Sequence, residues 1–210
     1  DKFGNNKTNE SWVYNPNTDN RYGIFHTANI DLKQRLSDQS ALTLSFLYEH
    51  SNLSRELDNE NFDFNNSTKA IGAKTLHFNQ KDQTPLDAFR FSVDYARDFD
   101  NGNRLSLGFQ PQLINIAGNF EYDTLNLVSN QMNAYTALEN GVDLTRVLYA
   151  AYIDYSGSLN KLKYLMGLRF EYTDQTMEID NPNYFSIFNR PAESTYKVQQ
   201  PDWFPTLHLA

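Results

Sequence analysis

The fold is decided by one stretch, Leu162-Lys163-Tyr164-Leu165-Met166-Gly167-Leu168-Arg169-Phe170-Glu171-Tyr172-Thr173. Every even position in it is large and apolar, whereas the odd positions carry polar residues or glycine, with Leu165 as the exception. Side chains alternate between the two faces of a β-strand, so a period of two predicts an extended strand with one apolar and one polar face.

The length of this stretch is that of a strand that crosses a membrane. Strands of soluble proteins usually have about 5–6 residues, roughly half of this run. At about 3.3 Å per residue and a tilt near 45°, its eleven steps climb about 26 Å, close to the apolar band of an outer-membrane barrel, which is about 25 Å tall. Aromatic residues lie near both ends of the apolar face, where a bilayer interface favours them. The stretch therefore predicts a transmembrane β-strand.

The composition of the chain fits this interpretation. The 210 residues carry a formal net charge of −8, which argues against a protein that tracks nucleic-acid phosphates. Aromatic residues make up 14% of the chain, although its mean hydropathy is −0.65. A barrel with a polar lumen and rings at the lipid interfaces combines both properties. The absence of cysteine excludes a disulfide framework and thiolate metal sites.

The same alternation recurs along the chain, and the connections differ in length. Alternating stretches occur near 22–33, 42–49, 89–96, 105–110 and 146–155, and another begins at 204. Short polar turns are predicted near 34–40, 99–103 and 156–161, and long polar loops near 51–87, 118–143 and 174–202. Outer-membrane barrels have short periplasmic turns and longer external loops. We therefore expect the short turns to be periplasmic and the long loops to be external.

The predicted fold class is all-β, an antiparallel up-and-down transmembrane β-barrel to which residues 1–210 contribute one segment of about seven or eight strands. Ile71–Phe78 could form a strand of its own, but we interpret it as part of an external loop, because another strand there would break the up-and-down order. A soluble surface β-sandwich that binds a ligand explains the alternation equally well, but not the strand lengths or the unequal connections. A small stand-alone outer-membrane barrel fits the chain length, but the terminal strand signals are missing.

The last third of the chain resembles a known family. Val147-Leu148-Tyr149-Ala150-Ala151-Tyr152 is followed by the stretch quoted above and then by Trp203-Phe204-Pro205-Thr206-Leu207-His208-Leu209. This order resembles the barrel of TonB-dependent receptors, of the outer-membrane β-barrel type found in Bacteroidota. There a strand with the pattern of Gly167-Leu168-Arg169, Glu171 and Thr173 precedes, across a long external loop, a strand in which a serine is usual at the position of Thr206.

The resemblance implies an integral protein of the cell outer membrane. Such receptors have barrels of about 22 strands, together with a plug domain and a TonB box that these residues do not show. We therefore expect an internal barrel fragment that contacts outer-membrane lipid, with the plug and TonB engaged through other parts of the protein. No nucleic-acid partner is expected. The implied function is uptake of a scarce nutrient, such as a siderophore, a glycan or another small or oligomeric ligand.

No pattern in the sequence indicates an enzyme. The histidines His26, His50, His77 and His208 lack the spacing of a zinc site. The acidic residues between 58 and 63 resemble a loose calcium loop, but the required glycine is absent. We therefore expect no catalytic residue, no cofactor and no bound metal.

Aromatic residues of the long loops are the candidates for ligand contact, because rings stack on sugars or chelating groups and lose little entropy on ordering. These candidates are Tyr122, Tyr135, Tyr184, Phe185 and Trp203. Alternatively, they pack one loop against another or belong to the aromatic girdle at the lipid interface. Charged residues on the polar strand faces, such as Arg169 and Glu171, are expected mainly to form ion pairs with one another.

Overall fold

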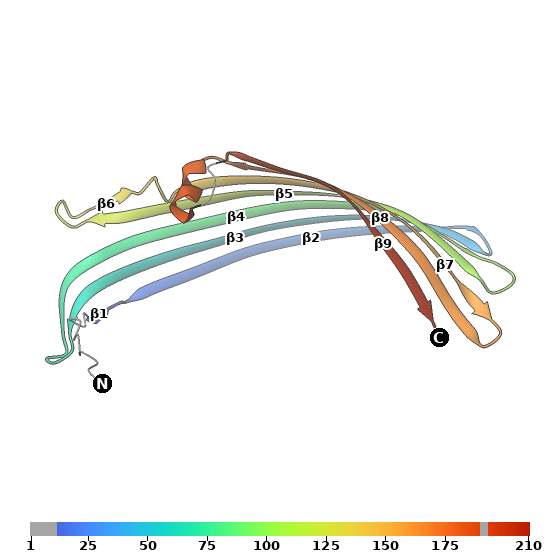
Figure 1. Cartoon of the computed structure of the whole chain (residues 1–210), viewed down its shortest axis with the longest axis horizontal. Helices are drawn as coiled ribbons and strands as arrows, with labels where there is room; N and C mark the ends of the chain where they lie inside the picture. The colour runs from blue at the N-terminus through green and yellow to red at the C-terminus, as the bar shows by residue number, and fades with distance from the viewer. Residues whose placement is uncertain (1–11, 190–192) are drawn as a thin grey trace, which may run out of the picture.

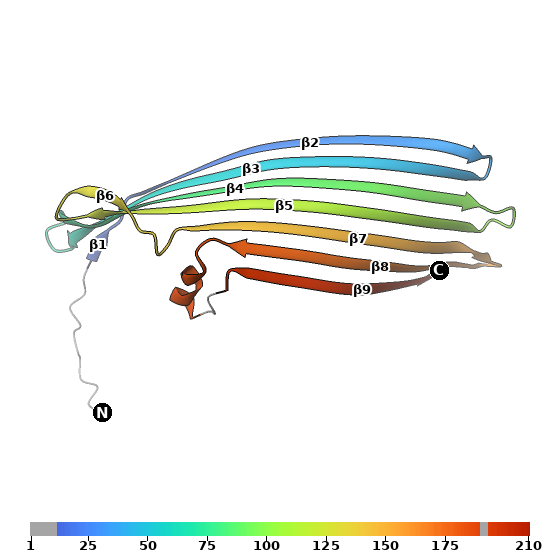
Figure 2. The ribbon, with the colours of Figure 1, turned by 90° about the horizontal axis from the view of Figure 1, so that it is seen from above.

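The computed structural model describes residues 12–189 and 193–210, and these form one curved antiparallel sheet (Figures 1 and 2). Its long strands are β2 (Asn17–Ser37), β3 (Ser40–Asn65), β4 (Ala70–Asp98), β5 (Arg104–Asn126), β7 (Asn140–Leu159), β8 (Leu162–Ile179) and β9 (Thr195–Leu209). Two short strands, β1 (Trp12–Tyr14) and β6 (Gln131–Ala134), pair with the far ends of β3 and β5. A 3-10 helix, η1 (Pro182–Phe188), lies between β8 and β9.

The predicted all-β, up-and-down architecture is confirmed. Each long strand pairs with the next long strand along the chain, and every pairing is antiparallel. Within the described residues the sheet does not close on itself, because β2 and β9 form its two edges. No helix in this part of the chain is long and apolar enough to cross a membrane.

Three tight connections lie together at one end of the sheet (Figure 2). They are residues 38–39, 99–103 and 160–161. Gly102, with a φ of 78°, and Asn160, with a φ of 56°, take the left-handed conformation that closes these turns. Glycine and asparagine tolerate this conformation better than other residues do. We call this end of the sheet the turn end and the opposite end the distal end.

Residues 51–87 are not the irregular loop that their polar composition suggested. Residues 51–65 extend β3 and residues 70–87 begin β4, so only residues 66–69 connect the two strands. Ile71–Phe78 is therefore the distal part of β4 rather than a loop or a separate strand, and the up-and-down order is kept. Sequences that are polar on both faces of a strand lack the alternation from which a strand is predicted.

Much of the other two predicted loops is strand as well. Residues 118–126 belong to β5 and residues 140–143 to β7. Residues 174–179 belong to β8, and residues 195–202 belong to β9. All these extensions lie at the distal end, so the strands run on well past the stretches from which they were predicted.

The two faces of the sheet can be told apart by the position of η1. The sheet forms an arc, and η1 lies on its concave side (Figure 1). Tyr184 of η1 meets the ring of Phe120 on β5 edge-on, with 6.2 Å between ring centroids. The side of the sheet that carries Phe120 is therefore the concave, inner face. Cross-strand partners point to the same side, so the register of the paired strands assigns their residues to one face or the other.

A glycine on the inner face makes room for a cross-strand tyrosine. Gly108 on β5 pairs with Tyr152 on β7, and a Cβ atom at Gly108 would overlap the Tyr152 ring. The Tyr152 ring lies across Gly108, and its hydroxyl donates a hydrogen bond of 2.5 Å to Asp94 on β4. The glycine thus lets one side chain tie three strands together, as rings that cover glycines do in other sheets.

We predict that Gly108→Ala destabilises the protein by about 1–3 kcal/mol, because the added methyl group must displace the Tyr152 ring. Gly118→Ala is the matched control on the inner face of the same strand, since its Cβ would lie 3.6 Å from the Val142 carbonyl oxygen, an ordinary contact. Denaturant unfolding of the full-length protein measures both. Equal stability of the two variants would contradict the role assigned to Gly108.

Candidate functional site

A continuous apolar band covers the outer face of the sheet. One register row shows its continuity: each residue in the row pairs with the next, and none is polar. The row consists of Leu32, Leu44, Val93, Phe109, Ala151, Phe170 and Trp203. On β8 the band runs from Leu162 to Tyr172, ten steps that climb about 23 Å at a tilt near 45°.

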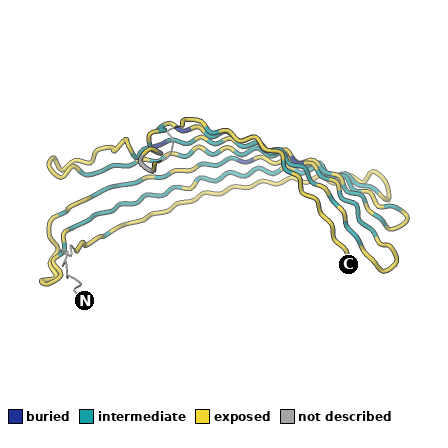
Figure 3. Tube along the Cα trace, in the orientation of Figure 1, coloured by how far each residue is buried: buried dark blue, intermediate teal, exposed yellow. Residues whose placement is uncertain are grey.

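The exposure of this band is the reverse of that in a soluble domain. Large apolar side chains lie open, with 69% of Ile30, 48% of Met166 and 45% of Phe109 exposed. The inner face is more enclosed, and Ala150 on it is fully buried. Figure 3 shows the resulting alternation of exposed and half-buried residues along the strands. So large an exposed apolar surface requires an apolar environment, and its height is that of a bilayer core.

The band ends on each strand where the outward residues become polar. On β3 and β4 the first such residues are His50 and Asp87, which pair with each other. On β5 and β7 they are Asn115 and Thr145, which also pair. On β8, however, the first outward polar residue is Asp174. It lies two residues nearer the turn end than Thr176, which is the partner of Thr145. The boundary therefore follows one register row from β3 to β7 and moves two residues towards the turn end at β8.

Beyond this boundary the amphipathic pattern inverts. On β5 the outward residues Leu105, Leu107 and Phe109 are apolar, but in the distal part the inward residues Ile114, Ile116 and Phe120 are apolar instead. The sequence signal of this inversion is a second alternating run with the opposite phase, part of which lies in the predicted loop 118–143. The distal part of the sheet thus has a polar outer face and a partly apolar inner face.

An inner apolar patch crosses five strands at this level. Leu86, Ile116, Leu144, Met177 and Tyr196 form one unbroken row of register partners, and all five residues are half-buried. The next row towards the distal end contains Gly118, Val142 and Ile179. Apolar residues on the concave face cannot contact lipid, so they must pack against groups inside the arc.

The segment that carries η1 is held over this patch by hydrogen bonds at its base. The Asn181 backbone N–H donates to Asn140 Oδ1 at 2.9 Å, and its side-chain amide donates to the carbonyl oxygens of Thr136 and Glu139 at 3.0 and 2.9 Å. Asn140 is buried, with 8% of its surface exposed. The Ile179 N–H donates to the Ser194 carbonyl oxygen at 2.9 Å, which joins the two ends of the segment.

A cavity of about 310 Å³ remains between η1 and the inner face. Its apolar lining comes from Ile116, Gly118, Phe120, Val142 and Tyr184, and its polar lining comes from Thr84, Asn119 and Asn140. None of the described residues that line it is charged.

Closer to the turn end, the inner face is polar and carries paired charges. The Arg169 guanidinium donates to Glu171 at 2.6 Å, which agrees with the ion pairing predicted for these two residues. A second cavity, of about 380 Å³, lies against β2–β5 among polar residues that include Asp31, Arg90 and Gln110. Behind the apolar band, the inner face therefore offers a water-compatible wall.

Three of the five predicted aromatic candidates lie near one another over the distal inner face. Tyr122 belongs to β5 rather than to a loop, and its ring stacks on Phe78 at 5.1 Å and meets Tyr135 edge-on at 6.3 Å. Burial, and to a smaller extent Tyr135, raises the pKa of Tyr122. Tyr184 meets Phe120, which is two residues from Tyr122 on the same face of β5.

The other two candidates are placed differently. Trp203 is not a loop residue: it lies in β9, pairs with Phe170 in the outer apolar band and is 62% exposed. Its position on the outer face excludes it from a site on the inner face. Phe185 belongs to η1, and its side chain lies outside the described residues.

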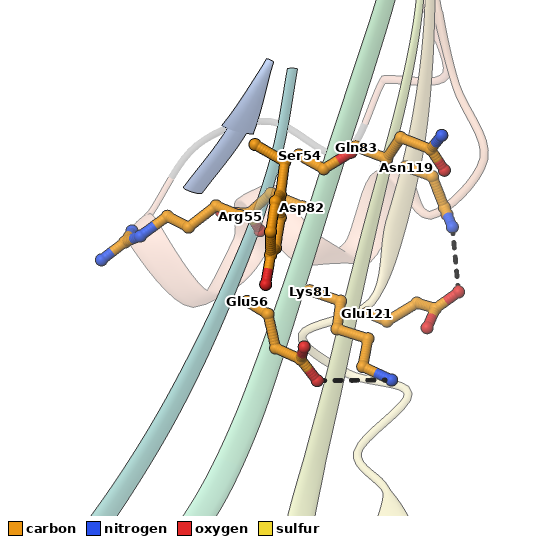
Figure 4. Close-up of a pocket in the computed structure, with 9 residues that line it drawn as sticks. Ser54, Arg55, Glu56, Lys81, Asp82, Gln83, Asn119 and Glu121 are labelled. Carbon is orange, nitrogen blue, oxygen red and sulfur yellow. Dashed lines mark hydrogen bonds and ion pairs between the residues drawn. The ribbon is translucent and has the colours of Figure 1, made fainter. Parts of the chain in front are cut away.

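The outer face of the distal extension is polar. A depression of about 290 Å³ crosses β3, β4 and β5 there (Figure 4). In it Lys81 Nζ lies 3.7 Å from Glu56 Oε1, and Asn119 donates a hydrogen bond of 3.0 Å to Glu121, whereas Arg55 points away from them. Arg55 lies on the inner face and donates to Asp19 at 2.9 Å, and this bond, together with that from Arg21, lowers the pKa of the Asp19 carboxyl group. These groups are suited to water, not to lipid.

The histidines do not gather into a metal site. His50 Nδ1 lies 2.9 Å from Asp87 Oδ1, and His77 Nε2 lies 2.9 Å from Asp58 Oδ1. Across residues 12–189 and 193–210, no group of three or more potential ligands is placed to hold a metal ion.

Comparisons with known proteins identify the family. The model of the outer membrane protein β-barrel family matches residues 33–210, so the chain belongs to this family and is integral to the outer membrane. The alternative of a soluble β-sandwich is therefore wrong. None of the curated proteins matches the chain significantly.

A solved structure shows the same fold. The unliganded ferric citrate transporter FecA is similar to this chain with a TM-score of 0.57 at 10% sequence identity. The match covers 90% of this chain and 25% of the FecA chain, so the chain spans about a quarter of the length of that transporter.

We predict that a charge in the middle of the outer apolar band is costly. Leu168→Arg should lower the free energy of unfolding in a bilayer by about 2–4 kcal/mol, because the guanidinium group must enter the lipid midplane. Leu165→Arg is the matched control, since Leu165 lies on the inner face of the same strand beside Ser156 and His208. Guanidinium titration of the full-length protein in phospholipid vesicles measures both, and a larger loss in Leu165→Arg would reverse the assignment of the two faces.

Proposed function

We propose that this member of the outer membrane protein β-barrel family forms part of the wall of a TonB-dependent receptor that imports a nutrient. The resemblance of its last third to receptors of the Bacteroidota type supports this proposal, as does its similarity in fold to a transporter. The wall supplies the lipid contact, the polar lumen surface and part of the ligand entrance.

The inversion of the amphipathic pattern is the observation that carries the proposal. In the range Leu105–Phe109 the apolar side chains of β5 point outward, so its outer face is suited to lipid. In the range Ile114–Phe120 they point inward, so the outer face is suited to water and the inner face to a packed interior. A passive, water-filled pore has no need of an apolar patch on its inner face, whereas a receptor that holds a ligand or a plug does. The distal end is accordingly the external end, and the tight turns are periplasmic.

In the proposed mechanism, energy coupling is carried out by the plug domain and TonB and not by these residues. A plug domain within the barrel contacts the polar inner face, and TonB acts on the plug by drawing on the proton gradient. Ligand capture falls to the distal inner face, where Tyr122, Tyr135 and Tyr184 lie. None of the residues that the structure describes takes a catalytic role in this mechanism.

The orientation can be tested with single cysteines, because the chain has none of its own. Val128, 97% exposed between β5 and β6, and Asn101, exposed in a tight turn, mark the two ends. In a cysteine-free full-length protein, we predict that a membrane-impermeant maleimide labels Val128→Cys on intact cells, and labels Asn101→Cys only after the outer membrane is opened. The opposite pattern would contradict the orientation.

Receptor function can be tested through TonB. We predict that the full-length protein in lipid nanodiscs binds the purified periplasmic domain of TonB, measured by surface plasmon resonance against empty nanodiscs. A correctly inserted barrel that shows no binding would exclude a TonB-dependent receptor and favour a stand-alone barrel.

A further inference from the structure

The structure assigns the cavity between η1 and the inner apolar patch as a subsite for an uncharged, ring-sized apolar group of the imported solute. This inference rests on the proposed uptake function, and it narrows the class of ligand.

The lining of the cavity selects against charge. Ile116, Phe120, Val142 and Tyr184 present apolar or aromatic surface, and no charged side chain is among the described lining residues. Transfer of an unpaired charge into such surroundings is costly. A phosphate, carboxylate or ammonium group would find its partners on other parts of the inner face, such as Arg55 or Asp19. The subsite therefore fits the neutral part of a ligand.

The size of the cavity sets the size of the group. Its volume of about 310 Å³ lies at the lower end of the range of about 300–1,000 Å³ for small-molecule pockets. A cavity of about 150 Å³ is enough for benzene, so this one holds a group of about two fused rings.

Polar side chains in the lining limit the orientation of a bound ring. Thr84 and Asn140 come from β4 and β7, and each offers hydrogen-bonding atoms beside the apolar surface. Asn140 Oδ1 is engaged by the Asn181 N–H at 2.9 Å, which holds its carboxamide in place. A few fixed polar groups in an apolar pocket are the usual means of orienting a ligand.

The cavity also has a built wall on the side away from the sheet. Three hydrogen bonds from Asn181 fasten the base of the η1 segment to residues 136–140. The edge-on contact between Tyr184 and Phe120 then places an aromatic ring over the apolar floor. Pre-positioned aromatic walls reduce the entropy lost on binding.

The probe for the test is 5-fluoroindole, which is neutral and has two fused rings, observed by fluorine NMR with the full-length protein in nanodiscs and with empty nanodiscs as the lipid control. We expect saturable binding to the protein that weakens at least tenfold in Gly118→Leu, whose side chain fills the cavity. Ala117→Leu, one residue away on the exposed outer face, should bind as the unaltered protein does. The charged analogue 5-fluoroindole-3-acetate should bind at least tenfold more weakly.

Tyr184→Ala keeps the test decisive if Gly118→Leu fails to fold, because Tyr184 lies in η1 rather than in a strand. It should also weaken binding of 5-fluoroindole, since it removes one aromatic wall. Three results would overturn the subsite. The first is equal binding by the unaltered protein and a folded cavity variant, and the second is binding to the empty nanodiscs alone. The third is no binding of the probe, as expected if the plug fills the cavity. If the protein binds the probe but not TonB, the subsite proposal stands and the TonB-dependent receptor is excluded. If it binds TonB but not the probe, the receptor proposal stands and the subsite is excluded.

Discussion

The structure depends on the pairing of backbone amides between strands. In hydrocarbon an unpaired N–H or C=O group costs several kcal/mol, so a β-sheet can cross a bilayer only if each strand pairs along its whole transmembrane length. Five long strands, β3, β4, β5, β7 and β8, meet this requirement on both sides with nearly unbroken antiparallel registers. The open edges at β2 and β9 are where the sheet still needs partner strands to satisfy it.

Once the pairing is fixed, the period of two assigns each side chain to lipid or to the interior. The outer apolar band and the polar inner wall are therefore two results of one register. The same register carries Gly108 opposite Tyr152, so that a ring can cross a neighbouring strand to reach Asp94. It also brings Leu86, Ile116 and Leu144 into one inward row, although they come from three strands far apart in sequence.

The inversion of polarity divides the wall into two zones. In the lipid zone the strands expose apolar residues such as Phe109 and Met166 on the outer face. In the distal zone charges such as Lys81 and Glu56 face outward, and apolar residues gather under η1. A single strand can thus cross the membrane at one end and line an inward-facing cavity at the other.

The sequence by itself determined the transmembrane stretches, because residues such as Leu162–Tyr172 alternate over the height of a bilayer. It also located the tight turns, where short polar runs and Asn-Gly limit the backbone. It did not reveal that residues 51–87 are mostly strand, since most residues on both faces of these strands are polar and leave little alternation to detect. Only the tertiary structure placed Trp203 in the lipid-facing band and Tyr184 over the inner face. The reason is physical: alternation is a local property of one strand, whereas the face that a residue occupies, and what covers it, is decided by register and curvature across many strands.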